Sequence, residues 1–145
     1  MDEIRKRAAE RARAMGLTYA GALLPAEAGE LMKAGAWLVD VRTKPELAYV
    51  GRIPGAAAVE WQTWPEGRPN PEFLAELAAL VPRDEPVMFI CRSGARSHSA
   101  AQAATQAGWR EAYNVLEGFE GDKDAAQHRG TLGGWKKACL PWIQS

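Results

Sequence analysis

An apolar run at residues 87–90 ends abruptly at Cys91, and a short polar loop with one glycine and two arginines follows it. Residues 97–107 then have the composition of a helix. A strand that delivers a cysteine into a tight loop ahead of a helix surrounds the sulfur with backbone N–H groups. These groups, the positive end of the helix and the guanidinium groups of Arg92 and Arg96 all favour an anion. The sequence therefore predicts an activated thiolate at Cys91.

Helical and strand patterns alternate along the rest of the chain. We predict helices at residues 2–15, 25–33, 71–80, 97–107 and 134–140, and strands at residues 17–20, 37–41, 56–59, 87–90 and 113–116. The segments 61–70 and 117–134 are predicted to be loops. This alternation is typical of the α/β class, with a central, mostly parallel sheet flanked by helices. A chain of 145 residues suits one compact domain.

The carboxyl ends of the predicted strands point to one candidate site. In an open parallel sheet, ligands bind beyond the carboxyl ends of the strands. The segments that leave the predicted strands should therefore meet at one edge of the sheet. That edge would gather around Cys91 the loop 117–134 and the side chains of Asp40, Arg42, Trp61, Trp64, Arg92 and Arg96.

Composition excludes several classes of protein. Lys+Arg and Asp+Glu both count 18, so the net charge is +0 and long-range attraction to nucleic acid or to an anionic membrane is not expected. No apolar stretch has the length needed to span a bilayer, and residues 1–13 lack the apolar core of a secretory signal. The two cysteines cannot form a disulfide framework and lack the spacing of a zinc site. We expect a cytoplasmic protein with a free thiol and no nucleic-acid or membrane partner.

Several short motifs together resemble a known family. They occur in the order seen in rhodanese domains, over about residues 19–142, and are Asp40-Val41-Arg42, Glu46, Gly51-Arg52-Ile53-Pro54-Gly55-Ala56, Cys91-Arg92-Ser93-Gly94-Ala95-Arg96-Ser97, Gly134-Trp135 and Leu140-Pro141. The chain resembles a single-domain rhodanese, which is a sulfurtransferase. The resemblance implies a rhodanese-like parallel α/β sheet. It assigns residues 17–145 to the sulfurtransferase domain and leaves residues 1–16 as a helical extension.

The resemblance also implies a mechanism. Cys91 would take the outer sulfur of thiosulfate, release sulfite and hold a persulfide until an acceptor such as cyanide or a thiol removes it. A protein could also serve as acceptor, and neither a metal nor an organic cofactor is required. The substrate-binding residues implied are Arg92, Ser93, Gly94, Ala95, Arg96 and Ser97. The residues implied to support the fold and the loop by ion pairing are Asp40, Arg42 and Glu46.

The chain departs from the family pattern at two places. Arg52 stands where the third motif usually carries histidine, which leaves the role of that side chain open. The insertion at residues 121–133 is longer than in a minimal domain. We expect it near the mouth of the site, where it could influence the choice of acceptor.

Two other functions remain as alternatives. Cysteine phosphatases and arsenate reductases also place a Cys…Arg loop after a strand, but their signatures have one more residue in the loop and commonly a histidine before the cysteine. Here four residues separate Cys91 from Arg96, and Ile90 precedes the cysteine. The shorter loop suits a sulfur atom better than a tetrahedral phosphate. The second alternative is a non-catalytic rhodanese-like module for sulfur relay or redox sensing, but such modules commonly lack the cysteine.

Other chemically capable residues have simpler interpretations. His98 is predicted to lie on the helix surface rather than act as a base, because a thiolate needs none. Cys139 is predicted to pack in a small-residue slot rather than act as a resolving thiol. Arg42 and Glu46 are predicted to form a structural ion pair.

The tryptophans near the predicted edge divide into two groups. Trp61 and Trp64 are predicted to cover edges of the core. Trp135 is predicted to line the mouth of the pocket.

Overall fold

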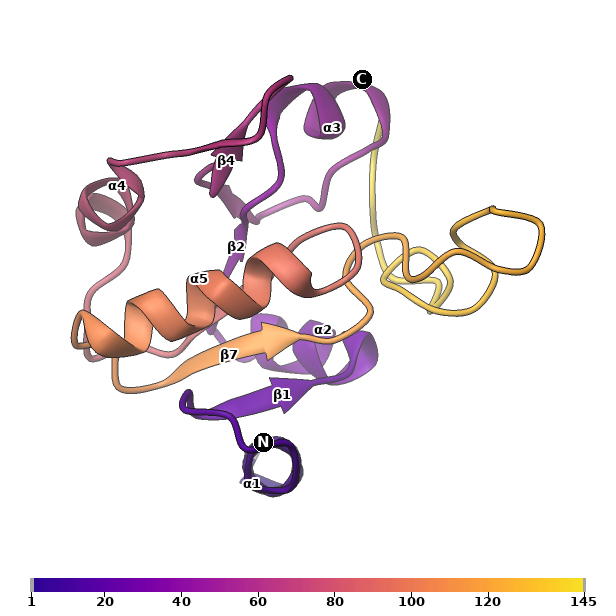
Figure 1. The fold of residues 1–145 in the computed structure, drawn as a ribbon. Coiled ribbons are helices and arrows are strands. Elements are labelled where there is room, and N and C mark those ends of the chain that lie inside the picture. Colours follow the sequence, from indigo (N-terminus) through magenta and orange to yellow (C-terminus); the bar gives the residue numbers. More distant parts are fainter. Residues whose placement is uncertain (1, 145) are drawn as a thin grey trace.

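A computed structural model describes residues 2–144 and has a five-stranded parallel sheet at its centre (Figure 1). The strands lie in the order β1 (Gly21–Leu23), β7 (Ala112–Val115), β6 (Val87–Ile90), β2 (Trp37–Asp40) and β3 (Ala57–Ala58). A separate antiparallel hairpin joins β4 (Gln62–Thr63) to β5 (Arg68–Pro69). The α/β class with a parallel central sheet, predicted from the sequence, is confirmed.

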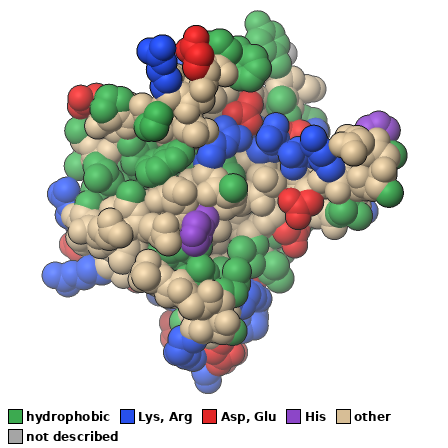
Figure 2. All heavy atoms as spheres, in the orientation of Figure 1, with side chains coloured by type: hydrophobic (Ala, Val, Ile, Leu, Met, Phe, Trp, Pro, Cys, Tyr) green, Lys and Arg blue, Asp and Glu red, His purple; other side chains and the backbone are tan. Residues whose placement is uncertain are grey.

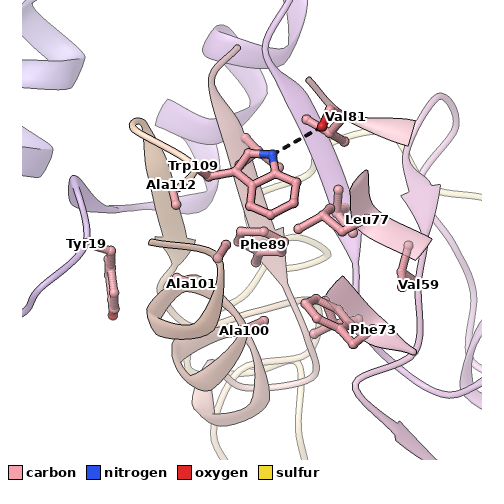
Figure 3. Close-up of a cluster of buried hydrophobic side chains, with 14 of the residues drawn as sticks. Tyr19, Val59, Phe73, Leu77, Val81, Phe89, Ala100, Ala101, Trp109 and Ala112 are labelled. Carbon is pink, nitrogen blue, oxygen red and sulfur yellow. Dashed lines mark hydrogen bonds between the residues drawn. The ribbon is translucent and has the colours of Figure 1, made fainter. Parts of the chain in front are cut away.

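Helices cover both faces of the sheet. They are α1 (Asp2–Met15), α2 (Pro25–Lys33), α3 (Lys44–Tyr49), α4 (Phe73–Leu80) and α5 (Ala95–Gln106). Buried side chains of α4 and α5 share one core cluster with β6, and Figure 3 shows this cluster. Buried side chains of α1 and α2 form the second cluster on the opposite face. Burial on both faces explains why the strands read as continuous apolar runs.

The two-residue period of a strand decides where Cys91 lies. Val87 and Phe89 pack in the α4–α5 cluster, whereas Met88 and Ile90 pack in the α1–α2 cluster. Cys91 continues this alternation and belongs to the α4–α5 cluster. The sulfur of Cys91 therefore lies on the face of the sheet that α5 covers.

Trp109 anchors the α4–α5 cluster at the end of α5. Its ring is buried, and its Nε1–H donates a hydrogen bond of 3.2 Å to the carbonyl oxygen of Val81, drawn as a dashed line in Figure 3. A buried indole usually finds such a partner. The guanidinium group of Arg83 lies 4.4 Å from the centre of the same ring.

The first strand is displaced from its predicted position. It spans Gly21–Leu23 rather than residues 17–20. Gly21, the first residue of β1, allows this strand to approach helix α1. A Cβ atom at Gly21 would lie 2.7 Å from the Cβ atom of Ala8.

Other segments also differ from the prediction. Helix α5 begins at Ala95, two residues before Ser97, and the predicted loop at residues 61–70 contains the β4–β5 hairpin. The helix predicted at residues 134–140 is wrong, since this segment forms turns. Gly134 and Cys139 both have positive φ angles, 106° and 61°, which a continuous helix does not allow.

Glu27 on α2 binds helix α1 to the rest of the domain through ion pairs. Its carboxylate accepts hydrogen bonds from Arg11 (2.6 and 3.0 Å), Arg7 (3.1 Å) and the amide of Leu24 (2.9 Å). Burial raises the pKa of Glu27, but these hydrogen bonds outweigh it and lower the pKa from 4.5 to about 2. The predicted helix at residues 2–15 is confirmed, while its division from the domain at residue 16 stays a prediction. None of the described helices is both long and apolar enough to cross a membrane.

We expect Glu27→Gln to lower the free energy of unfolding by about 1–2 kcal/mol at neutral pH, because two arginines lose a charged partner. The folded-state pKa of Glu27 lies below its ordinary value, so this stabilisation is present above pH 4.5 and disappears as the pH falls toward about 2. Urea unfolding of both proteins across that range measures the difference. Glu30→Gln on the same helix, where the carboxylate is exposed, is the control and should change little. A constant difference at every pH would contradict the assignment.

Candidate active site

Cys91 follows β6 directly and is 1% exposed. Its Sγ accepts a hydrogen bond of 3.1 Å from the backbone N–H of Gly94 and lies 3.3 Å from the hydroxyl oxygen of Ser97. Of the described residues, Gly94 alone donates a backbone hydrogen bond to this sulfur. The sequence predicted a ring of amides around the sulfur, but one amide donates to it, and the Ser97 hydroxyl group lies within hydrogen-bond distance.

Gly94 makes the tight turn between the sulfur and α5. It has a φ of 112° and caps the N-terminus of the helix, a conformation that L-amino acids with a side chain rarely adopt. The turn brings the free N–H end of α5 next to Cys91 and leaves Arg92 and Ala95 exposed, with Ser93 and Arg96 partly exposed. The predicted binding residues 92–97 thus lie together around the sulfur, and their roles toward a substrate remain predictions.

The buried polar side chains of Ser97 and Asn114 stabilise this turn. The hydroxyl group of Ser97 donates to Asn114 Oδ1 at 2.5 Å, and Asn114 Nδ2 donates to the carbonyl oxygen of Gly94 at 3.3 Å. Asn114 lies on β7 and is 3% exposed. The sequence analysis missed it, although a polar residue inside an otherwise apolar strand is a usable signal, because a buried amide needs partners.

Tyr19 extends the polar cluster toward the surface of α5. Its hydroxyl group lies 2.8 Å from Nδ1 of His98. Burial raises the pKa of Tyr19. His98 is half-buried and bonded, so the prediction of a simple surface position was incomplete.

Glu46 pairs with Arg96 rather than with Arg42, which corrects the predicted ion pair. The two carboxylate oxygens accept hydrogen bonds of 2.7 and 2.9 Å from Arg96, and Oε1 also accepts from the amide and hydroxyl groups of Thr43. Burial raises the pKa of Glu46, but the bonds from Arg96 and Thr43 outweigh it and lower the pKa to about 2. The ion pair with Glu46, which lies on α3, thus fixes the position of the Arg96 side chain at the start of α5.

Arg42 pairs instead with Asp40, and both side chains are buried. Arg42 Nη2 donates to Asp40 Oδ2 at 2.8 Å and to the carbonyl oxygen of Gly51 at 2.7 Å. The guanidinium carbon lies 4.2 Å from the centre of the Phe119 ring. This pair ties the end of β2 to two other segments, which is consistent with the supporting role predicted for both residues.

The segment after β7 binds the backbone of the cysteine loop. The amide of Phe119 donates to the carbonyl oxygen of Cys91 at 2.8 Å, and the amide of Glu120 donates to that of Arg92 at 2.9 Å. A Cβ atom at Gly118 would lie 2.6 Å from the carbonyl oxygens of Cys91 and Arg92, so only glycine fits there. The insertion at residues 121–133 begins directly after this contact.

A cavity of about 270 Å³ lies beside the cysteine loop. The loop, the start of α3 and the β4–β5 hairpin form its walls, with Thr43, Glu46, Trp64, Pro65, Arg92 and Arg96 among the lining residues. Figure 2 shows Lys and Arg side chains gathered on this face, between α5 and the region of α3 and β4. We call this cavity the mouth.

Trp64 and Trp135 occupy positions opposite to those predicted, whereas Trp61 lies as predicted. Trp64 lines the mouth and is 67% exposed, whereas Trp135 is 2% exposed and packs in the α1–α2 core. Trp61 does cover the core, since its ring contacts Phe73 edge-on at a centroid distance of 4.9 Å. The hairpin, which the sequence analysis treated as a loop, is what carries Trp64 out to the mouth.

Two residues singled out in the sequence lie outside the mouth. Arg52 is exposed, pairs through its backbone with Ile143, and lines a different cavity. Cys139 is exposed, so the prediction that it fills a packed slot was wrong. Its positive φ angle places it in a turn near the surface rather than in a helix.

The comparisons with known proteins agree with this geometry. The family model described as the rhodanese-like domain matches residues 24–125. The chain belongs to the rhodanese-like family. The matched residues include β2, β6, the cysteine loop and β7.

Individual relatives place the chain within this rhodanese-like family. An uncharacterized protein of Rickettsia conorii, RC0915, is 35% identical over 112 residues, covering 74% of this chain and 82% of its own. Thiosulfate sulfurtransferase GlpE of Pseudomonas aeruginosa is 30% identical over 98 residues, covering 68% of this chain and 79% of its own. The crystal structure of Rv0390 from M. tuberculosis superposes with a TM-score of 0.81 at 46% identity, covering 88% of this chain and all of that one.

Proposed function

We propose that this rhodanese-like protein is a sulfurtransferase that carries sulfur as a persulfide on Cys91. The observation that carries the proposal is the position of the Cys91 sulfur, which faces the Gly94 amide at the N-terminus of α5. A fixed amide and a helix N-terminus stabilise negative charge on sulfur without reorganisation during the reaction. Thiosulfate sulfurtransferases among the relatives support the same chemistry.

The first half-reaction loads the sulfur. The Cys91 thiolate attacks the outer sulfur of thiosulfate, and a new S–S bond forms. The S–S bond of thiosulfate breaks, and its electron pair leaves with sulfite. The protein then holds Cys91–S–S⁻, and total charge is conserved at −3 on both sides of the step.

The second half-reaction transfers the outer sulfur. A thiophilic acceptor, cyanide or a thiolate, attacks that atom, and the electron pair of the breaking bond returns to Cys91. Thiocyanate or a new persulfide leaves, and the thiolate is regenerated without metal or cofactor. We place this reaction in the cytoplasm, because a reducing compartment preserves free thiols.

A half-reaction experiment tests this proposal. Incubation with thiosulfate and no acceptor should release about one sulfite per chain, because a single cysteine is loaded once. Sulfite can be measured with a dye after rapid removal of the protein. Release of no sulfite, or continuous release without acceptor, would contradict a stable persulfide at Cys91.

We expect Arg96→Ala to lower kcat/KM for thiosulfate about tenfold or more, because it leaves the Glu46 carboxylate unpaired at the mouth, where it repels an anionic donor. Arg52→Ala should change the same constant less than about twofold, since Arg52 is exposed and lines another cavity. Steady-state kinetics with thiosulfate and cyanide measures both variants. Equal losses would contradict the placement of Arg96 beside the substrate.

A further inference from the structure

We propose that the mouth is the acceptor subsite, and that it selects small organic thiols carrying one negative charge. This inference rests on the proposed sulfur transfer, and it names the class of acceptor that the same site would use. Trp64 and Arg92 are the residues that would provide the selection. The charge, the apolar surface and the size of the mouth support this assignment.

The charged side chains that line the mouth, Glu46, Arg92 and Arg96, together carry one net positive charge. Glu46 and Arg96 neutralise each other through two hydrogen bonds. The guanidinium group of Arg92 is exposed and makes no hydrogen bond or ion pair with any described residue. An arginine without a protein partner at a cavity next to the cysteine loop can bind one carboxylate with two parallel hydrogen bonds.

Trp64 gives the mouth an apolar wall. Its side chain is 67% exposed, although the other large aromatic residues of the hairpin region, Trp61 and Phe73, pack against each other. Exposed tryptophan combined with arginine at a concave surface is typical of binding sites, since the ring supplies contact area at low entropic cost. Pro65 continues the same wall. The carbon chain of an organic ligand therefore has a surface to contact.

The size of the mouth exceeds what the donor needs. At about 30 Å³ for each water-sized atom, thiosulfate with its five heavy atoms would fill roughly half of the cavity. The cavity measures about 270 Å³. Cyanide would fill much less and could contact neither Trp64 nor Arg92 extensively. An acceptor with a short carbon chain and a terminal carboxylate matches both the volume and the charge.

Atoms and charge are conserved in the transfer of sulfur to such an acceptor. The acceptor thiolate R–S⁻ attacks the outer sulfur of Cys91–S–S⁻, forming R–S–S⁻. The bond between the two sulfurs on the protein breaks, and its electron pair stays with Cys91. The outer sulfur is bonded to Sγ at ~2 Å, and in this proposal the acceptor reaches it from the mouth. The carboxylate meanwhile contacts Arg92, and the chain contacts Trp64.

A single-turnover experiment with thiols of different charge tests the inference. The protein is loaded with thiosulfate, freed of excess donor, and mixed with 3-mercaptopropanoate, 2-mercaptoethanol, cysteamine or cyanide. The loss of the persulfide is followed by intact mass. Each thiol is compared between the wild type and a variant, so that differences in intrinsic thiol reactivity cancel. The variants are Arg92→Gln, Trp64→Ala and, as a control on the same hairpin, Arg68→Gln, which does not line the mouth.

We expect Arg92→Gln to slow transfer to 3-mercaptopropanoate about tenfold more than transfer to cysteamine. Trp64→Ala should slow transfer to all three organic thiols at least about fivefold more than transfer to cyanide. Arg68→Gln should leave the ratios among the acceptors as in the wild type. If Arg92→Gln and Trp64→Ala slow all acceptors equally, the subsite is wrong and sulfur transfer itself stands. If the wild type never forms a persulfide, the proposed function is wrong, and the subsite is wrong with it.

Discussion

Cys91→Ser is expected to reduce sulfur transfer from thiosulfate to cyanide to the background rate, a loss of at least about a thousandfold. A serine hydroxyl group has almost the shape of the thiol and can still accept the Gly94 N–H. It is not ionised at neutral pH, and it cannot form a persulfide. The variant should therefore fold as the wild type does and lose only the chemistry. Release of thiocyanate measures the rate.

Cys139→Ser is the matched control for this variant. Cys139 is the second cysteine of the chain and is exposed, so its loss should leave the steady-state rate within about twofold. Turnover near the wild-type rate in Cys91→Ser would refute the assignment of the nucleophile. If neither the wild type nor Cys139→Ser transferred sulfur, the non-catalytic module would be the better description.

Arg42→Ala should be the most destabilising single change near the site. It leaves the Asp40 carboxylate buried without its partner, which typically costs about 3–5 kcal/mol. It also removes the donor to the Gly51 carbonyl oxygen and the contact with Phe119. We expect the Tm to fall by roughly 10 °C or more. Thermal unfolding followed by circular dichroism measures this loss.

A double variant separates the effect of the two charges from the effect of the volume that the two side chains fill. Asp40→Leu combined with Arg42→Met replaces both charges with apolar side chains, and should recover much of the stability lost in Arg42→Ala. Arg68→Ala, which removes an exposed arginine, should change the Tm little. A loss in Arg42→Ala as small as that in Arg68→Ala would contradict the role assigned to the buried pair.

Local patterns in the sequence were enough to predict the backbone elements around Cys91. The strand, the turn at Gly94 and α5 are formed by residues that are adjacent in the chain. An apolar run, a glycine and a helix-forming stretch each predict one of these elements from the local sequence. The helix at Pro25–Lys33 was predicted at its observed bounds, with proline in the first turn. Alternating elements also predicted the parallel sheet correctly.

Partners distant in the sequence could not be predicted in the same way. Glu46 was expected to pair with Arg42, four residues earlier, but the fold brings Arg96 to it from fifty residues away. Spacing along the chain ranks the near partner first, and only the packing of α3 against the start of α5 reverses that order. Asn114 escaped notice for the same reason, because its partners Ser97 and Gly94 lie on another segment.

Close approaches of the backbone were also hidden in the sequence. Gly21 and Gly118 look like loop or breaker residues, but each marks a place where a side chain would collide with a neighbouring segment. The exposure of Trp64 and the burial of Trp135 depend on the hairpin and on the turns after residue 134. Neither feature has a hydrophobic period that the sequence could reveal.

Persulfide formation on Cys91 can be measured by intact mass spectrometry of the protein before and after thiosulfate. We expect a gain of one sulfur atom in the wild type, located on Cys91 by peptide mapping, and its loss when cyanide is added. We expect no gain in Cys91→Ser. A wild-type mass that does not change, or a sulfur atom found on Cys139, would contradict persulfide formation on Cys91.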